Sequence, residues 1–532
     1  MHPCLSVDEI LRLIACELVA SRAKRTAVAL ACCCKSSEDP TLDALWETQD
    51  GLLPLLKSLP GDVWRAEAGQ FVSRVMAFIF SALKRLVQKS FERIPTKAEW
   101  CRFRKYAQRI QILNVDTSDD SMTPEVLLAL QLRTTNKPFL PRLRTFECTE
   151  ATEAFIPFIP LLLSPKTIEI TIAFAQDSPT VAVASVISRF PSLCPDLEYI
   201  NLSDLPKNSV ITNAVSEMVL GCNRDCLQVF QVDSPLTEEA REVVYQLPRL
   251  THLWGVFEGP TSLPAVMLPE LTAIDVECED DLSWLRGFRG ARLEKLESVG
   301  IGSEHSHIGD FLGEFEGVAR TTTAQNTLSR FEFRTSRPWN PNYRALLSFR
   351  HLKQLEIDFS CHDSCSSTID DDMVADLTRA MPKLEILRLG EDPCKTPTGV
   401  TVNGLIGLAH RCPHLSELRI HFQAASLVDT TVVAATQSLS DHEPVVQRRD
   451  CALTDLEVGE IPIPAQSGSK IPFILLQIFP HILNVVYTNE QWKTVAETVN
   501  EFRQISAFVH RSGKAHPSHP QLSLVMDYQE MQ

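Results

Sequence analysis

A short apolar motif recurs along most of this chain. It places apolar residues at positions i, i+3 and i+5, and fixed internal repeats of this kind indicate a stacked architecture. Positions i+3 and i+5 share one face of a strand because side chains alternate along extended backbone. Each copy therefore predicts a short strand with one buried face. The clearest copies are Leu352/Leu355/Ile357, Leu384/Leu387/Leu389, Leu415/Leu418/Ile420 and Leu453/Leu456/Val458.

Fourteen copies follow one another from Ile110 to Ile482, on average about 29 residues apart, which is the long end of the range for leucine-rich repeats. Well-formed copies are Ile110/Leu113/Val115, Leu197/Ile200/Leu202, Leu227/Phe230/Val232, Leu271/Ile274/Val276, Leu328/Phe331/Phe333 and Ile482/Val485/Tyr487. Weaker copies are Leu143/Phe146 before Cys148, Thr167/Ile170/Ile172, Leu250/Leu253 before Gly255, and Leu293/Leu296 before Ser298.

Helical periodicity appears between the strand motifs. Asp371–Met381 and Thr401–Arg411 carry apolar residues at helical spacing, and Pro382 and Pro413 follow them. Proline ends a helix and favours extended backbone before it. The sequence therefore predicts an α/β leucine-rich-repeat solenoid over residues 100–487, with parallel strands and outer helices. The alternative is an ordinary α/β domain whose strands match the motif by coincidence.

The C-terminal segment, residues 488–532, is expected to close the array. Thr488–Gln491 has the form of a capping box, and a tail after Arg511 is polar and expected to be mobile. Between them, the residues on one helical face are Trp492, Val495, Ala496, Val499, Phe502 and Ile505.

The first 50 residues predict a small three-helix module, followed by connecting helices over residues 51–99. Ser6 and Glu9 form a capping box for the first helix, and Asp39 with Pro40 is expected to start the third. The first helix has an apolar stripe of Ile10, Leu13, Ile14 and Leu18, and the second carries Ala27, Leu30, Ala31 and Cys34. So small a core is marginal alone, which suggests that the module leans on a partner.

Several segments together resemble the F-box/leucine-rich-repeat proteins that form large families in fungi. The segments are 4–14, 29–34, 42–46, 51–56 and 100–107, so with the repeats the resemblance extends over nearly the whole chain. It rests mainly on apolar spacing. The chain departs from the family at Asp8, where a proline usually precedes the glutamate of the first helix. Aspartate is tolerated at a helix start, so the departure bears on partner contact more than on fold.

The resemblance implies a substrate receptor of a ubiquitin ligase, with the F-box on a Skp-type adaptor of a cullin ligase and the repeats on an unknown substrate protein. Carried over by position, the adaptor-binding residues would be Leu5, Val7, Ile10, Ile14, Leu18, Leu45 and Trp46. The alternative role for apolar side chains of this module is to close its small core. We favour this core role for Leu13, Leu30 and Trp46. A second function hypothesis is a repeat scaffold whose F-box-like module has lost adaptor binding and serves only as a cap.

Charge and cysteine content limit the classes of partner and the cellular compartments to be expected. The net charge of −16 argues against nucleic acid, whose phosphates require clustered Lys and Arg. Charged residues at Asp8, Glu9, Arg12 and Glu17 interrupt any signal peptide, and Ile471–Thr488 holds too many polar and proline residues for a membrane helix. Sixteen scattered cysteines suggest thiols in a reducing compartment. We expect a cytoplasmic or nuclear protein without membrane association.

Catalytic and metal-binding patterns are weak. Cys361, His362 and Cys365 have neither the spacing nor the second ligand pair of a structural zinc site, and neither a phosphate-cradling glycine loop nor a nucleophile-elbow motif occurs. The sequence therefore predicts no enzyme, no cofactor and no metal. Nine basic residues between Lys84 and Arg109 would suit an acidic partner, although a solvated helical face is the simpler interpretation.

Overall fold

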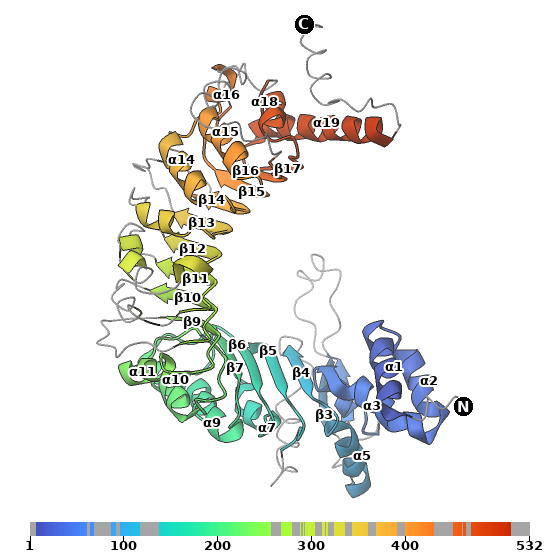
Figure 1. Ribbon diagram of the computed structural model, residues 1–532. Helices are drawn as coiled ribbons and strands as arrows, with labels where there is room; N and C mark the ends of the chain where they lie inside the picture. Colours follow the sequence, from blue (N-terminus) through green and yellow to red (C-terminus); the bar gives the residue numbers. More distant parts are fainter. Residues whose placement is uncertain are drawn as a thin grey trace. The chain divides into compact units, whose positions relative to one another are not determined.

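The structure is a computed structural model. It describes residues 7–60, 64–68, 87–91, 96–116, 138–256, 268–278, 288, 291, 293–303, 311–313, 315–317, 324–335, 343–359, 369–390, 399–429, 451–459, 461–463 and 470–511. The chain divides into two compact units, Met1–Val256 and Phe257–Gln532. We describe each unit by itself, and Figure 1 labels their helices and strands.

Unit 1 begins with the three helices that the sequence predicts: α1 (Asp8–Ala20), α2 (Lys24–Cys33) and α3 (Lys35–Glu47). Small side chains let the helices approach closely, and Leu11, Ala15, Ala27 and Ala44 are buried between them. No side chain caps α1, whose N-cap residue is Val7. The helix therefore starts after Val7, and Ser6 of the predicted capping box lies outside the described residues.

Helix α3 begins earlier than the sequence suggests. Its first residue is Lys35, so Asp39 and Pro40 lie inside the helix and our assignment of them to its start was wrong. The extended backbone at Cys34 ends α2 and starts α3. The buried Ser37 hydroxyl lies at this corner, 2.7 Å from the carbonyl oxygen of Leu30 and 2.9 Å from that of Cys34, and can donate to either one.

The sheet of unit 1 has parallel strands in chain order, beginning with a strand that the repeat motif did not mark. This is β1 (Thr48–Asp50), which leaves α3 directly and pairs with β4. The strands that follow are β4 (Ile112–Asp116), β5 (Thr145–Ala151), β6 (Glu169–Phe174), β7 (Tyr199–Ser203), β8 (Val229–Val232) and β9 (His252–Val256). The three-helix module therefore runs directly into the edge strand of the sheet.

The motif positions of unit 1 align across these strands. The i+3 residues are in register from β4 to β9 and every one is buried: Leu113, Phe146, Ile170, Ile200, Phe230 and Leu253. The second column, from Val115 to Gly255, is buried in the same way. The segments between the strands hold α5 (Lys97–Ala107), the 3-10 helix η4 (Ile156–Phe158), α7 (Ile159–Leu162), α8 (Thr180–Ile187), α9 (Phe190–Leu193), α10 (Ser209–Gly221) and α11 (Glu238–Val244).

Residues 51–99 differ from the predicted connecting helices. Their described part holds one short helix, α4 (Leu53–Leu56), and the first residues of α5. It also holds an antiparallel pair, β2 (Trp64–Ala68) with β3 (Val87–Phe91).

Unit 2 repeats the same plan, and its described strands are parallel and again in chain order. They are β10 (Ala273–Cys278), β11 (Ser298–Ser303), β12 (Arg330–Thr335), β13 (Gln354–Phe359), β14 (Ile386–Leu389), β15 (Glu417–Ile420), β16 (Asp455–Gly459) and β17 (Asn484–Tyr487). The buried i+3 column from β12 onward is Phe331, Leu355, Leu387, Leu418, Leu456 and Val485. The apolar motif thus forms one continuous row of core side chains within each unit, as the sequence predicts.

The register of one motif copy was wrong. We placed its strand positions at Leu296 and Ser298, but β11 starts at Ser298, and its buried side chains are Val299 and Ile301. Leu296 is fully buried and takes the first position of the motif. Leu293, three residues earlier, is also buried, and the two leucines offered the sequence motif a second register.

The described helices of unit 2 include the 3-10 helices η6 (Arg344–Ser348) and η7 (Glu490–Trp492), with α13 (Ala324–Thr327), α14 (Asp371–Ala380), α15 (Val402–Arg411), α16 (Ser426–Asp429), α18 (Ile471–Ile478) and α19 (Lys493–Arg511). Helices α14 and α15, both predicted, lie on one side of strands β13–β15 (Figure 1). Their starts are linked, because the Asp371 carboxylate accepts hydrogen bonds from the backbone N–H groups of Thr401 at 2.8 Å and Gly404 at 3.1 Å.

A helical segment closes the repeats, as predicted. Asn489, rather than Thr488, caps η7, since its side chain accepts from the Gln491 N–H. Trp492 is fully buried and its indole N–H donates to the Ile461 carbonyl oxygen at 2.7 Å. Across the described residues, no helix combines the length and apolarity needed to span a membrane.

Candidate interaction surfaces

Helix α1 keeps part of its apolar surface outside the three-helix core. Leu11 and Ala15 face inward, whereas Val7 is 41% exposed and Ile14 38%. Leu13 is 70% exposed, so our assignment of this residue to the core was wrong. The apolar residues of α1 occupy a wider arc than α2 and α3 cover, because small residues fill the interior. Ile10 and Leu18 lie at the edge of the covered arc and are half-buried.

The remaining predicted adaptor residues are less exposed to solvent. Leu45 and Trp46 are both half-buried, and so is Leu30. The ring of Trp46 stacks on Tyr106 of α5 with a centroid distance of 4.7 Å and an interplanar angle of 26°. Trp46 therefore joins the module to α5 instead of sitting wholly inside the core. Leu5 lies outside the described residues.

Helix α5 is also tied to α3 by charge. Lys105 donates to Glu38 at 2.8 Å, and the buried Arg109 guanidinium pairs with Asp39 and Asp43. The hydrogen bond to Glu38 raises the pKa of Lys105. Part of the basic run that precedes strand β4 therefore has a structural role. Helix α5 starts at a capping box that was not predicted, in which Thr96 and Glu99 cap each other.

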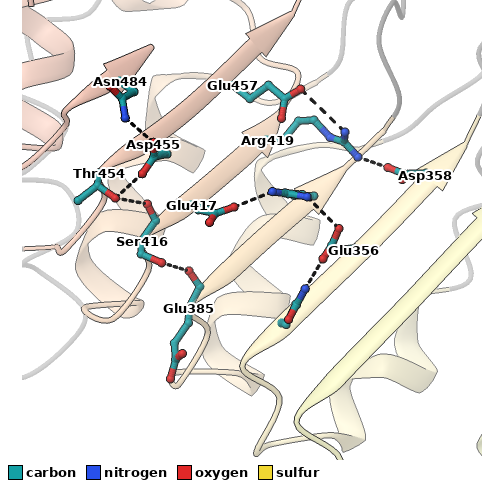
Figure 2. Close-up of polar contacts among 12 residues, drawn as sticks. Glu356, Asp358, Glu385, Ser416, Glu417, Arg419, Thr454, Asp455, Glu457 and Asn484 are labelled. Atoms are coloured by element: carbon teal, nitrogen blue, oxygen red, sulfur yellow. Dashed lines mark hydrogen bonds and ion pairs between the residues drawn. The ribbon is translucent and has the colours of Figure 1, made fainter. Parts of the chain in front are cut away.

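The solvent face of the unit 2 sheet carries a network of charged side chains, which Figure 2 shows. Arg388 on β14 bridges two strands, donating to Glu417 of β15 at 2.7 Å and to Glu356 of β13 at 3.2 Å. Arg419 on β15 pairs with Asp358 of β13, and lies 3.9 Å from Glu457 of β16. Each arginine thus holds carboxylates from two different strands.

A second polar cluster, at β16 and β17, has neutral donors. Asn484 donates to Asp455 at 2.7 Å, and the Thr454 hydroxyl donates to the same carboxylate at 2.6 Å (Figure 2). These two hydrogen bonds lower the pKa of Asp455. Hydroxyls just before the strands also link neighbouring repeats, as where Ser416 donates to the Glu385 carbonyl oxygen at 3.0 Å.

At its other end the unit 2 face has closely spaced carboxylates. Glu332 on β12 accepts from Arg330 at 2.9 Å and pairs with Arg334. Burial alone would raise the pKa of Glu332, but the two arginines outweigh it and the pKa is lowered. The Asp275 side chain lies over Gly300 of β11, whose added Cβ would be 2.9 Å from the Asp275 carboxyl carbon. Burial and the nearby Glu332 raise the pKa of Asp275.

The solvent face of the unit 1 sheet is different in kind. Strands β4–β9 contain no lysine or arginine. Here a carboxylate meets a neutral donor, since Glu169 accepts from the Thr145 hydroxyl at 2.7 Å. Towards β9 the face becomes amide and aromatic, with the Tyr199 hydroxyl donating to Gln231 at 3.3 Å. Trp254 continues the row of Gln231 on β9.

The cysteine thiols fall into two chemical groups. Burial raises the pKa of Cys148, Cys194 and Cys412 to about 12, which makes them packing residues. Hydrogen bonds with Ser36 and Ser37 lower the pKa of Cys34 to about 7. Within the described ranges, no group of His, Cys, Asp and Glu could hold a metal ion. The Cys361–His362–Cys365 cluster lies outside them.

The fold and these surfaces define an α/β protein of stacked parallel-strand repeats that presents two open sheet faces and a small helical module. No family model matches the chain, and no curated protein matches it. The sequence identified the module and the core positions. It did not predict the charged and polar contacts on the solvent faces of the strands, because the residue types at those positions follow no pattern.

Proposed function

We propose that this chain is a receptor of the F-box/leucine-rich-repeat kind, which recruits a substrate protein through its repeats to a Skp-type adaptor of a cullin ubiquitin ligase. One observation carries the proposal: α1 exposes Val7, Leu13 and Ile14 on a module that continues directly into a repeat sheet. Clustered exposed apolar side chains mark contact sites. Asp8, which replaces the family's usual proline, is the first residue of α1 and leaves the helix intact.

Adaptor binding by the full-length chain tests this proposal. The chain is co-expressed with a Skp-type adaptor, and copurification is measured for the wild type, for Val7→Asp with Ile14→Asp, and for Ile10→Asp with Ile14→Asp. A carboxylate placed in an apolar contact is desolvated without a partner, so we expect both double variants to lose the adaptor. Val7 and Ile14 are exposed, so their replacement leaves the core of the module intact.

Val28→Asp is the matched control. Val28 is 51% exposed on α2 of the same module, so this variant adds the same kind of charge outside the proposed contact. It should retain the adaptor. A wild-type chain that fails to bind any adaptor, or a control that loses it equally, would contradict the proposal.

A second candidate function is a repeat scaffold in which the module only caps the sheet. It is favoured by the pairing of β1 with β4 and by the Arg109 contacts to α3, which make the module part of unit 1. Removing residues 1–50 should lower the melting temperature under both functions, because it uncovers the edge of β4. Adaptor binding by the wild type distinguishes the two.

A further inference from the structure

We propose that the solvent face of strands β4–β9 binds an extended polypeptide segment of a partner protein that carries lysine or arginine side chains. The inference rests on the proposed role of the repeats in holding a substrate, and it names the chemistry of that substrate. It is independent of the adaptor contact on α1.

The charged strand residues of this site are carboxylates. Glu147 and Glu169 stand on the adjacent strands β5 and β6, in rows fixed by the pairing of Glu147 with Thr171 and of Thr145 with Glu169. The strand sequences from β4 to β9 supply no lysine or arginine to balance them. Glu147 and Glu169 are only half-buried, so solvent or a partner reaches them. Complementarity therefore calls for positive groups on the partner.

The same face offers a second kind of contact beside the carboxylates. Tyr199 lies in the row of Glu169 on the adjacent strand, and Trp254 lies on β9. Both rings are half-buried on the open side of the sheet. Aromatic faces attract ammonium and guanidinium groups, so carboxylates and rings select the same partner side chains.

Strand spacing sets the length of the segment. Neighbouring strands are about 4.8 Å apart, so β5 and β9, four strand intervals apart, are separated by about 19 Å. An extended chain rises about 3.3 Å per residue, and a segment of about six residues would reach from Glu147 to Trp254. A basic side chain near each end would then meet carboxylates at one end and an aromatic ring at the other.

The ion pairs on the unit 2 face indicate that attraction of a basic partner is specific to unit 1. There, Arg388 and Arg419 already occupy the carboxylates of Glu356, Glu417 and Asp358. A basic partner would have to compete with guanidinium groups that are held in place. The acidic rows of unit 1 have no such arginines on their strands.

Fluorescence anisotropy on the full-length chain tests the inference. The probe is a fluorescein-labelled nine-residue peptide of lysine, arginine and serine, and the comparison probe replaces each basic residue with glutamate. We expect the wild type to bind only the basic peptide, and more weakly at high salt because mobile ions screen exposed charges. Glu147→Gln with Glu169→Gln should weaken binding by about tenfold, a change of about 1.4 kcal/mol.

Glu385→Gln with Glu457→Gln is the matched control, since it removes the same charge from unit 2. It should change the affinity by less than about twofold, because it leaves Glu147 and Glu169 in place and the remaining effect of net charge is screened by salt. Trp254→Ala should weaken binding without changing the net charge. Equal losses in the two double variants would show attraction to net charge alone and overturn the proposal. So would an absence of binding by the wild type, or equal binding of the acidic probe. Adaptor copurification is a separate readout, so failure here leaves the proposed ligase contact standing.

Discussion

The strands of unit 1 and unit 2 share one plan of core residues, but their solvent-facing side chains balance charge in different ways. In both units the i+3 and i+5 side chains form buried columns in register. On the solvent side, β12–β15 carry Arg330, Arg334, Arg388 and Arg419, whereas β4–β9 carry neither lysine nor arginine. The core positions are constrained by packing and the positions between them are not. A repeat can therefore keep its fold while its open faces acquire different chemistry.

The difference also changes what a single charge contributes to folding. Glu356 is only 7% exposed, so its carboxylate depends on Arg388 for compensation. Glu169 in unit 1 is half-buried and accepts from a neutral hydroxyl. Loss of one partner from a desolvated ion pair is costly, whereas a hydrated carboxylate loses little. Four predictions test this contrast.

The largest effect should come from the columns that the units share. Ile200→Ala in unit 1 and Leu387→Ala in unit 2 each empty a fully buried position. Each should lower the free energy of unfolding by about 2–5 kcal/mol. Urea titration followed by circular dichroism measures both, and a cost below about 1 kcal/mol in one unit only would show that the two cores are not equivalent.

Removing an arginine from the unit 2 face should be the next largest effect. Arg388→Ala removes the guanidinium of β14 that pairs with the buried Glu356 carboxylate. Breaking a fully buried pair costs about 3–5 kcal/mol, and because Arg388 is 36% exposed we expect about 2 kcal/mol. Adding Glu356→Gln to Arg388→Ala should restore part of the loss. Failure of the second substitution to restore any stability would argue against an electrostatic cause.

The pH dependence should differ in sign between two carboxylates, Glu332 of unit 2 and Asp233 of unit 1. Arg330 and Arg334 lower the pKa of Glu332, so this carboxylate stabilises unit 2 above its unfolded pKa of about 4.3. That contribution is lost as the pH falls through the lower folded pKa. Burial raises the pKa of Asp233 in unit 1, so its cost at neutral pH is recovered on acidification. Glu332→Gln should flatten the decline in stability below about pH 4.5, measured by urea titration, and Asp233→Asn should stabilise the fold slightly at neutral pH. A steeper decline in Glu332→Gln would reverse the assignment.

The part of the fold that the sequence predicted is the part that packing dictates. Leu384, Leu387 and Leu389 could be placed because a strand with one buried face must repeat every second residue. Ambiguity arose where two registers were both apolar, as at Leu293 and Leu296. Strand β1 was missed because Thr48–Asp50 has no apolar motif and is defined by pairing with β4.

The candidate surfaces were less predictable for physical reasons. Leu13 fits the apolar stripe of α1. Because the small residues Ala15 and Ala27 make the core narrow, α2 and α3 bury only part of that stripe and Leu13 stays exposed. The Arg388 and Arg419 pairs join residues about 30 to 60 positions apart in sequence, so only the register of the sheet brings them together. A sequence search for charged residues two positions apart between core leucines would have found Glu417 and Arg419, although not their partners.

The smallest expected effect is the sharpest test of the unit 1 face. Glu169→Gln removes a charge but keeps the shape and an acceptor for the Thr145 hydroxyl. Its cost should be below about 0.5 kcal/mol, the range for surface changes that break no buried contact, and far below that of Arg388→Ala by the same urea titration. If this variant were as destabilising as Arg388→Ala, the carboxylate would have a structural role. The acidity of the unit 1 face would then be needed for folding. A stable Glu169→Gln variant would instead show that folding does not need this charge, which leaves it available for a partner.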